Sequence, residues 1–386
     1  MLPSIKKVAL LILFSCCFSC VVLAKSTPPS LGAEGAILMD AATGQVLYEK
    51  NAYKQLAPAS TTKIITAILA IESGRLDEKI TVSKNAASTP GSTMHLEEGQ
   101  IITIRELLTG LLMRSGNDGA IAIAESVGGS VDGFVEMMNK KASEIGAYNT
   151  HFRNPHGLSA PGHHSTAFDL AWIARYAMNN PIFAEIVGTR NTSIDWQDSN
   201  GDEHERDLKN TNKLLWMLEE ADGVKTGTTN EAGPCLVSSA TKNDQRLIAV
   251  TLHDPARWKD SQALLEWGFK EFSLFQYASA GDQVGDVKVE KGVIDRLRPI
   301  LTEDAAMVVE KDHHDKIDTT IDLPDKIKSP IYKGQQIGEL KFVKDGKIIK
   351  SFALLSPRDV EERTLVNLFF QELTNLFRLF AGWGLL

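Results

Sequence analysis

The sequence is poor in cysteine and has no excess of positive charge. Only 4 of its 386 residues are cysteines, and Cys16, Cys17 and Cys20 lie close together near the N-terminus. The remaining Cys235 has no partner in the body of the chain, which excludes a disulfide-rich scaffold. The formal net charge of −8 argues against a nucleic-acid-binding surface, because such surfaces are normally basic. With 43% hydrophobic and 23% charged residues, the composition is that of an ordinary globular protein of two or three domains.

The first 24 residues have the pattern of an export signal. Two lysines precede an apolar run over residues 8–22, and the small residue Ala24 ends the segment. A permanent membrane anchor is one alternative, but about 15 apolar residues are fewer than the roughly 20 that a spanning helix needs. A lipoprotein signal at Cys16 is another, although Phe14 fits a lipidation motif poorly. The pattern predicts a signal peptide over residues 1–24 and a mature protein that is exported from the cytosol.

Residues 25–277 mix helical and strand patterns and form the longest segment. Helices are expected where apolar residues recur at helical spacing, and strands where short runs of β-branched residues are bounded by turn residues. These patterns predict a hairpin over 37–48, helices over 64–71, 104–113, 120–127 and 131–145, and strands over 222–228, 235–241 and 246–252. Because helices and strands do not alternate strictly, the segment is expected to be a layered α+β domain.

Residues 278–362 change to short alternating runs, which predict a small all-β domain. Its strongest local signal is Lys344-Asp345-Gly346, which lies between two such runs. This sequence predicts a tight hairpin turn, because glycine readily adopts the positive φ that such turns require. The other strands are expected over 286–289, 306–309, 316–321, 337–343 and 347–355.

Residues 363–386 end the chain with an amphipathic helical pattern. Polar residues such as Asn367, Gln371 and Arg378 gather on one stripe, and the apolar face covers about 200° of the helical wheel. A helix docked on its own β-domain is the alternative, but it needs an apolar stripe of only about 100°. The wide apolar face favours a helix that lies in a membrane interface. Its few charges nearly cancel, so attachment would rest on apolar insertion.

Ser60 and Lys63 form the first candidate for chemistry. Ser-x-x-Lys occurs three times, but Ser4 leaves with the signal peptide and Ser239 ends a β-like run. Ser60 opens a predicted helix, so its side chain and that of Lys63 lie on one face about one turn apart. A serine hydroxyl needs an adjacent base, and lysine can act as one if burial and a second cation lower its pKa. An ordinary helix N-cap is the alternative interpretation of this serine.

Two further motifs follow along the chain. In Ser115-Gly116-Asn117 a second hydroxyl could relay a proton and an amide could orient the substrate, although a plain helix terminus is the alternative. Lys225-Thr226-Gly227 occurs once, whereas average composition predicts roughly 0.1 such tripeptides in a chain of this length. It lies on a predicted strand edge, where Gly227 would let a substrate backbone approach closely, and Lys225 could supply the second cation.

In this order, the three motifs resemble the signature set of penicillin-recognising serine enzymes. Three other segments are similar to the D-alanyl-D-alanine carboxypeptidases, which are low-molecular-mass penicillin-binding proteins: His156-Gly157-Leu158, residues 164–169 and residues 264–269. The resemblance covers the whole chain. It implies a β-lactamase/transpeptidase-like catalytic domain with an antiparallel sheet flanked by helices, then the β-domain and a C-terminal anchor at the periplasmic face of the bacterial inner membrane.

The resemblance also implies the reaction and its catalytic residues. The enzyme would remove the terminal D-alanine from peptidoglycan stem peptides, without a metal or cofactor, and β-lactams would acylate it. Ser60 would attack the carbonyl between the two terminal D-alanines, with Lys63 as the general base. Ser115, held by Asn117, would help to pass a proton to the departing D-alanine.

Substrate binding is implied for a second group of residues. Lys225 would set the electrostatics of the site, Gly227 would admit the peptide, and Thr226 would hold the substrate carboxylate. The backbone N–H groups of Ser60 and Thr228 would bind the oxyanion, a site type worth roughly 3 kcal/mol per donor. Thr228 stands where relatives often have a histidine, and this difference could change the rate and the pH dependence of deacylation. Arg257 lies in a segment that often carries a substrate-facing arginine.

Several alternatives share part of this pattern. A β-lactamase of the commonest serine type would have Ser-Asp-Asn and a Glu-x-x-Leu-Asn loop, neither of which matches here. An endopeptidase of the same fold tends to lack the β-domain, and an exported wall-binding scaffold would not need the Ser60 hydroxyl. A zinc site at His156, His163 and His164 is disfavoured, because the chain lacks His-Glu-x-x-His.

Overall fold

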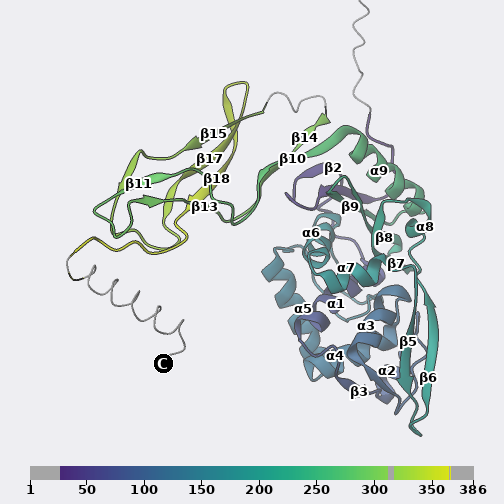
Figure 1. The fold of residues 1–386 in the computed structure, drawn as a ribbon. Coiled ribbons are helices and arrows are strands. Elements are labelled where there is room, and N and C mark those ends of the chain that lie inside the picture. The colour runs from purple at the N-terminus through teal and green to yellow at the C-terminus, as the bar shows by residue number, and fades with distance from the viewer. Residues whose placement is uncertain (1–26, 312–316, 365, 367–386) are drawn as a thin grey trace, which may run out of the picture.

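The computed structural model describes residues 27–311, 317–364 and 366, and it has two parts (Figure 1). A larger part combines helices with antiparallel sheets, and a smaller all-β part projects from it. The predicted α+β class followed by an all-β domain is therefore confirmed. The predicted signal peptide and all but the first residues of the predicted C-terminal helix lie outside the described residues. Within the described ranges, no helix is both long and apolar enough to cross a membrane.

A five-stranded antiparallel sheet organises the larger part. The strand order is β2-β1-β9-β8-β7, so that β7 forms one edge. The bounds are Gly35–Asp40 for β1, Val46–Lys50 for β2, Ala221–Thr229 for β7, Gly233–Lys242 for β8 and Gln245–Leu252 for β9. The hairpin over β1 and β2 and the three later strands occur where the sequence predicts them.

The two faces of this sheet bury different residues, as the two-residue period of a strand requires. On β1, Ile37 and Met39 belong to the large core shared with the helices, whereas Leu38 packs in a second core on the other face. Helix α9 (Arg257–Glu271) covers that second face, and α6 (Ala167–Met178) covers the first. Gly268 on α9 allows close packing, because a Cβ there would lie 2.6 Å from Leu38 Cδ2.

Most of the remaining helices pack below the sheet in a separate layer, and only the short helix over Leu214–Met217 lies beside α9 instead (Figure 1). The predicted helices are confirmed as α1 (Lys63–Glu72), α3 (Ile104–Met113), α4 (Asn117–Gly128) and α5 (Val131–Ile145). Further helices are α2 (Lys84–Ala87), α7 (Pro181–Gly188) and α8 (Leu214–Met217). Helix α1 is buried at eight consecutive positions from Lys63 to Ala70, so it forms the centre of this layer.

A small second sheet, which the sequence patterns do not predict, lies at the far end of the larger part. Its order is β3-β4-β5-β6, with bounds Lys79–Thr81, Ile101–Thr103, Asn191–Gln197 and Glu203–Lys209. Strands β5 and β6 form a hairpin that is mostly exposed. Strand β6 is rich in charged residues, and the hairpin has only three apolar residues, Ile194, Trp196 and Leu208, so the alternation of apolar and polar residues that signals a half-buried strand is weak.

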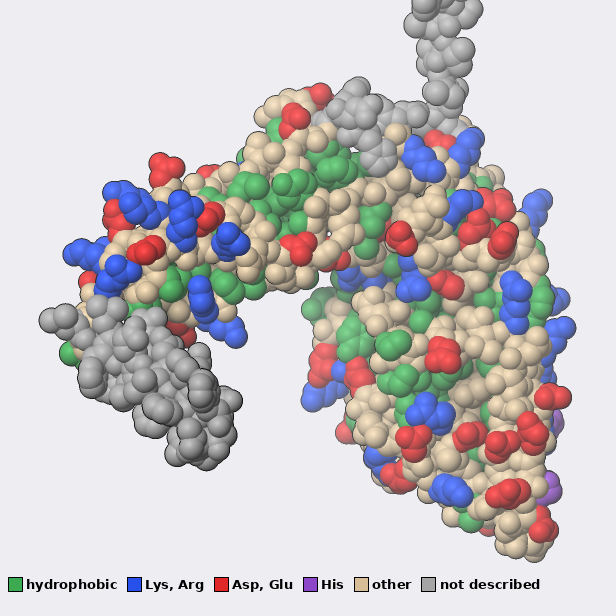
Figure 2. Space-filling model, viewed as in Figure 1, with side chains coloured by type: hydrophobic (Ala, Val, Ile, Leu, Met, Phe, Trp, Pro, Cys, Tyr) green, Lys and Arg blue, Asp and Glu red, His purple; other side chains and the backbone are tan. Residues whose placement is uncertain are grey.

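The all-β part begins where α9 ends. Strand β10 (Phe272–Ala278) pairs antiparallel with β14 (Ala305–Glu310) and connects the two parts. One sheet contains β13 (Ile300–Leu301), β18 (Lys347–Leu355), β17 (Gln336–Lys344) and β15 (Ile317–Asp322). Another contains β12 (Arg296–Leu297), β11 (Val287–Glu290) and β16 (Lys326–Lys328). In Figure 2, apolar side chains gather along the β10–β14 connection, and charges of both signs cover the far end.

The hairpin turn in this part confirms the sequence prediction in detail. Lys344 pairs with Lys347, which leaves Asp345 and Gly346 as a two-residue loop. Both loop residues have positive φ, 50° and 74°. A type I′ turn has this conformation at its two central positions.

Candidate active site

Ser60 lies in a short 3₁₀ turn, Ala59–Thr62, that precedes α1 and rests against β7. The sequence places this serine at the opening of a helix, and the N-cap alternative is not borne out, because the Ser60 side chain caps nothing. The preceding Ala59 has a positive φ of 49°, which is uncommon for a residue with a side chain. Such a turn presents the partly exposed Ser60 hydroxyl at the edge of the sheet.

Lys63 is completely buried and directs its amine at Ser60. Its Nζ lies 3.0 Å from Ser60 Oγ, 2.7 Å from Asn117 Oδ1 and 2.7 Å from the His156 carbonyl oxygen. Burial, and then the positive charge of Lys225, lower the pKa of Lys63 well below its usual value of 10.5. The negative charge of Asp118 opposes this shift. The neutral amine is thus favoured beside the serine hydroxyl, as a general base requires.

Ser115 and Asn117 lie at the turn between α3 and α4, and Asn117 contacts Lys63. Asn117 begins α4, accepts a hydrogen bond from Lys63 through Oδ1 and donates one from Nδ2 to the Pro90 carbonyl at 2.7 Å. The family resemblance implies that Asn117 holds Ser115. In the described residues, however, no hydrogen bond joins the two side chains, and Asn117 is bonded to Lys63 and Pro90. Ser115 is placed by its backbone, with φ of 65°, and its hydroxyl makes no hydrogen bond to the described residues.

Strand β7 brings Lys225, Thr226, Gly227 and Thr228 beside the turn that carries Ser60. A Cβ at Gly227 would lie 2.9 Å from the Ser60 backbone nitrogen, so only glycine lets the strand approach the nucleophile's turn this closely. Lys225 is buried, and burial followed by the charge of Arg257 lowers its pKa to about 7. Its Nζ donates to the Thr226 carbonyl at 3.1 Å, not to Lys63 or Ser60. The side chain of Thr226 faces Thr211, with 3.4 Å between the hydroxyl oxygens.

Arg257, at the start of α9, is brought to the same strand. Its Nη1 donates to the Gly227 carbonyl at 2.6 Å, to Thr228 Oγ1 at 2.8 Å and to the Cys235 carbonyl at 3.2 Å. These bonds hold the end of β7 in place. Arg257, for which the family resemblance implies a substrate-facing position, is thus bonded to the end of β7.

A loop over residues 153–163 supplies contacts that the motifs do not identify. Gly157 has φ of 88°, and a Cβ there would lie only 1.9 Å from the Ala59 carbonyl oxygen. His163 Nδ1 accepts a hydrogen bond from the Arg153 backbone N–H, so Nε2 carries the proton and donates to Thr62 Oγ1 at 2.9 Å. The loop therefore packs on the nucleophile's turn. The His156-Gly157-Leu158 segment pointed to this loop through the family resemblance. Its residues did not indicate that the loop packs on the turn that carries Ser60.

The loop histidines are neutral at physiological pH. Burial, and then the charge of Lys63, lower the pKa of His156 to about 3. Burial, and then His151 and His164, lower the pKa of His163 to about 4. Across the described part of the chain, no three His, Cys, Asp or Glu side chains are placed to hold a metal ion.

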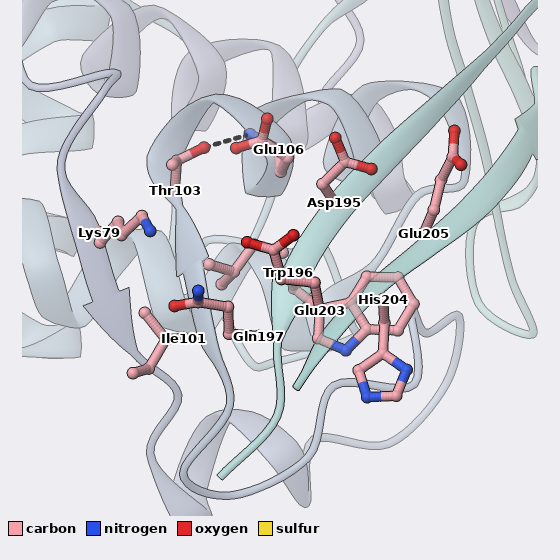
Figure 3. Close-up of a pocket in the computed structure, with 11 residues that line it drawn as sticks. Lys79, Ile101, Thr103, Glu106, Asp195, Trp196, Gln197, Glu203, His204 and Glu205 are labelled. Carbon is pink, nitrogen blue, oxygen red and sulfur yellow. Dashed lines mark hydrogen bonds between the residues drawn. The ribbon is translucent and has the colours of Figure 1, made fainter. Parts of the chain in front are cut away.

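A separate pocket of about 410 Å³ lies on the sheet formed by β3 to β6 (Figure 3). Four acidic side chains, Glu106, Asp195, Glu203 and Glu205, line it, and none of the candidate site residues does. Glu106 Oε2 is buried without a hydrogen-bond partner in the ranges described. Burial, together with the charge of Asp195, raises the pKa of Glu106.

Replacing Glu106 with glutamine is expected to raise the melting temperature more at about pH 8 than at about pH 4. The raised pKa means that the folded state disfavours the ionised carboxylate, so stability is lost as the pH rises through that pKa, and glutamine avoids the loss. Because the group is only partly buried, the gain should stay below about 1 kcal/mol. The exposed Glu205, changed to glutamine, is the matched control. An equal gain at both pH values would contradict this explanation.

Comparison with known proteins identifies the family of the chain. Residues 22–256 match a family model described as D-alanyl-D-alanine carboxypeptidase. Residues 272–362 match one described as penicillin-binding protein 5, C-terminal domain. The D-alanyl-D-alanine carboxypeptidase DacF of Bacillus subtilis is 36% identical over 340 residues, which cover 86% of each chain. DacD of Escherichia coli is 34% identical over 368 residues and 91% of each chain.

Solved structures agree with the sequence comparisons. Penicillin-binding protein 5 from Haemophilus influenzae has a TM-score of 0.76 at 31% identity, and the match covers 87% of this chain and 100% of that one. The DD-transpeptidase of Streptomyces K15, at 35% identity and a TM-score of 0.61, covers 63% of this chain and 99% of its own. The chain therefore belongs to the D-alanyl-D-alanine carboxypeptidases, the serine hydrolases that form the low-molecular-mass penicillin-binding proteins.

Proposed function

We propose that Ser60 is the nucleophile of this carboxypeptidase and that it attacks the carbonyl between the two terminal D-alanines of a peptidoglycan stem peptide. The observation that carries the proposal is the 3.0 Å contact of Ser60 Oγ with the amine of the buried Lys63. As Oγ bonds to the carbonyl carbon, the neutral Lys63 amine takes its proton. The bond to the terminal D-alanine then breaks, and Ser115 relays the proton from Lys63: its hydroxyl gives a proton to the departing amine and takes one from the Lys63 ammonium, which becomes neutral again.

The substrate is oriented by β7. The peptide pairs with this edge strand, the side chains of Thr226 and Arg257 hold its terminal carboxylate, and Lys225 adds positive charge to the site. The scissile carbonyl then lies between the backbone N–H groups of Ser60 and Thr228, which stabilise the oxyanion. The close approach of Gly227 to Ser60 supports this arrangement.

Water completes the reaction by hydrolysing the acyl-enzyme and releasing the shortened peptide. A β-lactam enters the same path, because its strained amide and carboxylate resemble the dipeptide terminus, and it acylates Ser60. Threonine at position 228 supplies the oxyanion N–H as any residue would. Its side chain accepts a hydrogen bond from Arg257 and carries no imidazole, so any group that assists deacylation lies elsewhere in the site.

The enzyme's location and domain division are part of the proposal. The signal-like residues 1–24 would direct export, and 363–386 would hold the enzyme at the periplasmic face of the inner membrane as a peripheral protein. Residues 25–277 would form the catalytic domain and 278–362 the β-domain. The pairing of β10 with β14 and the family match over 272–362 support a boundary a few residues earlier than 277.

The proposal is tested by incubating the full chain with a diacyl-tripeptide that ends in D-Ala-D-Ala and measuring free D-alanine. The wild type should release it continuously, and Ser60→Ala should release none above the rate of the uncatalysed reaction. Ser83→Ala, which removes a serine hydroxyl at the start of α2, away from Ser60, is the matched control and should retain wild-type release. Release by the Ser60→Ala variant at the wild-type rate would refute the assignment.

A further inference from the structure

A pocket of about 510 Å³ lies in the all-β part, outside the catalytic site. Two of the residues that line it, Arg298 and Arg358, come from segments that are far apart in the sequence. The antiparallel pairing of β13 with β18 brings these segments together. Ile300 pairs with Leu355, so the chain before Ile300 and the chain after Leu355 leave the sheet at the same end. The two arginines therefore reach one pocket from adjacent segments.

The pocket carries an excess of positive charge. A third arginine of the lining, Arg296, forms an ion pair with Asp286 at 2.7 Å, and Asp286 is the one acidic side chain among the described residues that line the pocket. Arg298 and Arg358 are exposed and make no hydrogen bond or ion pair with any residue of the described ranges. Two guanidinium groups at one pocket repel each other, so an anion that contacts both replaces a repulsion with two attractions.

A phosphate group suits these donors. Each guanidinium presents a planar fork of N–H groups that can bond two phosphate oxygens at once. The pocket is within the range of about 300–1,000 Å³ that small-molecule sites occupy, so it is larger than a phosphate alone needs. The buried Leu297 and the half-buried Pro357 also line it, and they offer apolar contact to the organic part of a phosphate ester.

The pocket lies next to the place where the described chain ends. The backbone N–H of Arg363 donates to the Lys291 carbonyl at 2.6 Å, and its guanidinium forms an ion pair with Asp295 at 2.7 Å. Asp295 directly precedes Arg296, which lines the pocket. The segment proposed as the membrane anchor, residues 363–386, therefore starts beside this pocket. A bilayer that receives this segment brings its headgroups close to the arginines.

We propose that Arg298 and Arg358 form a site for a phosphate group, which the headgroup of an anionic phospholipid supplies. The phosphate chemistry rests on the arginines alone, whereas the lipid as its source rests on the proposed membrane location. The site gives the β-domain a contact with the bilayer that is separate from apolar insertion of the last segment. It adds a preference for anionic lipid that this segment, whose few charges nearly cancel, does not supply.

The lipid source is tested by co-sedimentation of the full chain with phosphatidylcholine vesicles that contain or lack phosphatidylglycerol. The wild type should bind the vesicles with phosphatidylglycerol more tightly. Arg298→Gln and Arg358→Gln should each weaken that binding about fivefold, the usual effect of one arginine near an anionic surface. Binding to phosphatidylcholine alone should be unchanged, because apolar insertion remains.

The matched control is Lys347→Gln, which removes an exposed positive charge at the opposite end of β18 from Arg358. This variant should bind both kinds of vesicle as the wild type does. An equal loss in Lys347→Gln would overturn the site, because it would show that the overall charge of the domain, and not the pocket, attracts the lipid.

Titration calorimetry with inorganic phosphate distinguishes a free anion from a lipid. Phosphate binding that is lost in Arg298→Gln, together with unchanged vesicle binding, would overturn the lipid source and identify a site for a soluble phosphate compound. Wild-type vesicle binding in both arginine variants, without any binding of inorganic phosphate, would overturn the site itself. Because the pocket lies outside the catalytic site, both variants should release D-alanine at the wild-type rate, so the proposed reaction stands or falls separately.

Discussion

Replacing Lys63 with methionine is expected to slow the acylation of Ser60 by benzylpenicillin about a thousandfold, the typical worth of a positioned general base. Methionine keeps the length and apolar character of the buried side chain but cannot accept a proton. The second-order acylation rate can be followed with a fluorescent penicillin. A rate within tenfold of the wild type would show that another group takes the Ser60 proton.

The pH dependence of the same rate gives an independent test. Acylation needs the neutral Lys63 amine, so the rate should rise with pH through the pKa of this residue. Burial and Lys225 lower that pKa well below 10.5, so the acidic limb should have its midpoint well below that value. The limb should disappear in Lys63→Met. Exposed Lys79, changed to methionine, controls for loss of a lysine elsewhere.

Replacing Gly157 with alanine is expected to destabilise the protein by about 3 kcal/mol and to slow acylation about a hundredfold. The alanine Cβ would meet the Ala59 carbonyl at 1.9 Å and Thr62 Oγ1 at 2.9 Å, which adds overpacking to the cost of a positive φ. The displaced backbone carries Ser60, and an error of about 1 Å at a reacting group can cost about a hundredfold in rate. Melting temperature and acylation rate measure the two effects.

Gly162 provides the matched control in the same loop. Its φ is 80°, but a Cβ there would meet only the Arg153 guanidinium, at 3.4 Å. Gly162→Ala should therefore show only the cost of a positive φ, about 1 kcal/mol, and nearly normal acylation. If both variants behaved alike, contact between the loop and the nucleophile's turn would not explain the effect of Gly157.

Local signals in the sequence were sufficient for much of the fold. The helical spacing after Pro58 predicted α1, and Asp345-Gly346 predicted a turn that has positive φ at both positions. The hairpin of β5 and β6 was missed, because β6 is mostly charged and the two strands together bury only a few apolar side chains. A strand that buries few side chains needs few apolar residues, so its sequence shows little of the pattern that predicts a strand.

In the candidate site, too, some features could be predicted from the sequence and others could not. Motif order was enough to select Ser60, Lys63 and Asn117, which the fold brings into direct contact. The contacts of Lys63 with the His156 carbonyl and of Asn117 with the Pro90 carbonyl were not predictable. They join segments far apart in the chain through backbone oxygens, which every residue type possesses, so no residue identity signals them.

The most direct test of the central claim is to locate the covalent adduct by mass spectrometry after treatment with benzylpenicillin. The account predicts one penicilloyl group per chain, attached to the peptide that contains Ser60, and no adduct in Ser60→Ala. An adduct on Ser115 or on any other residue, or the absence of an adduct in the wild type, would contradict it.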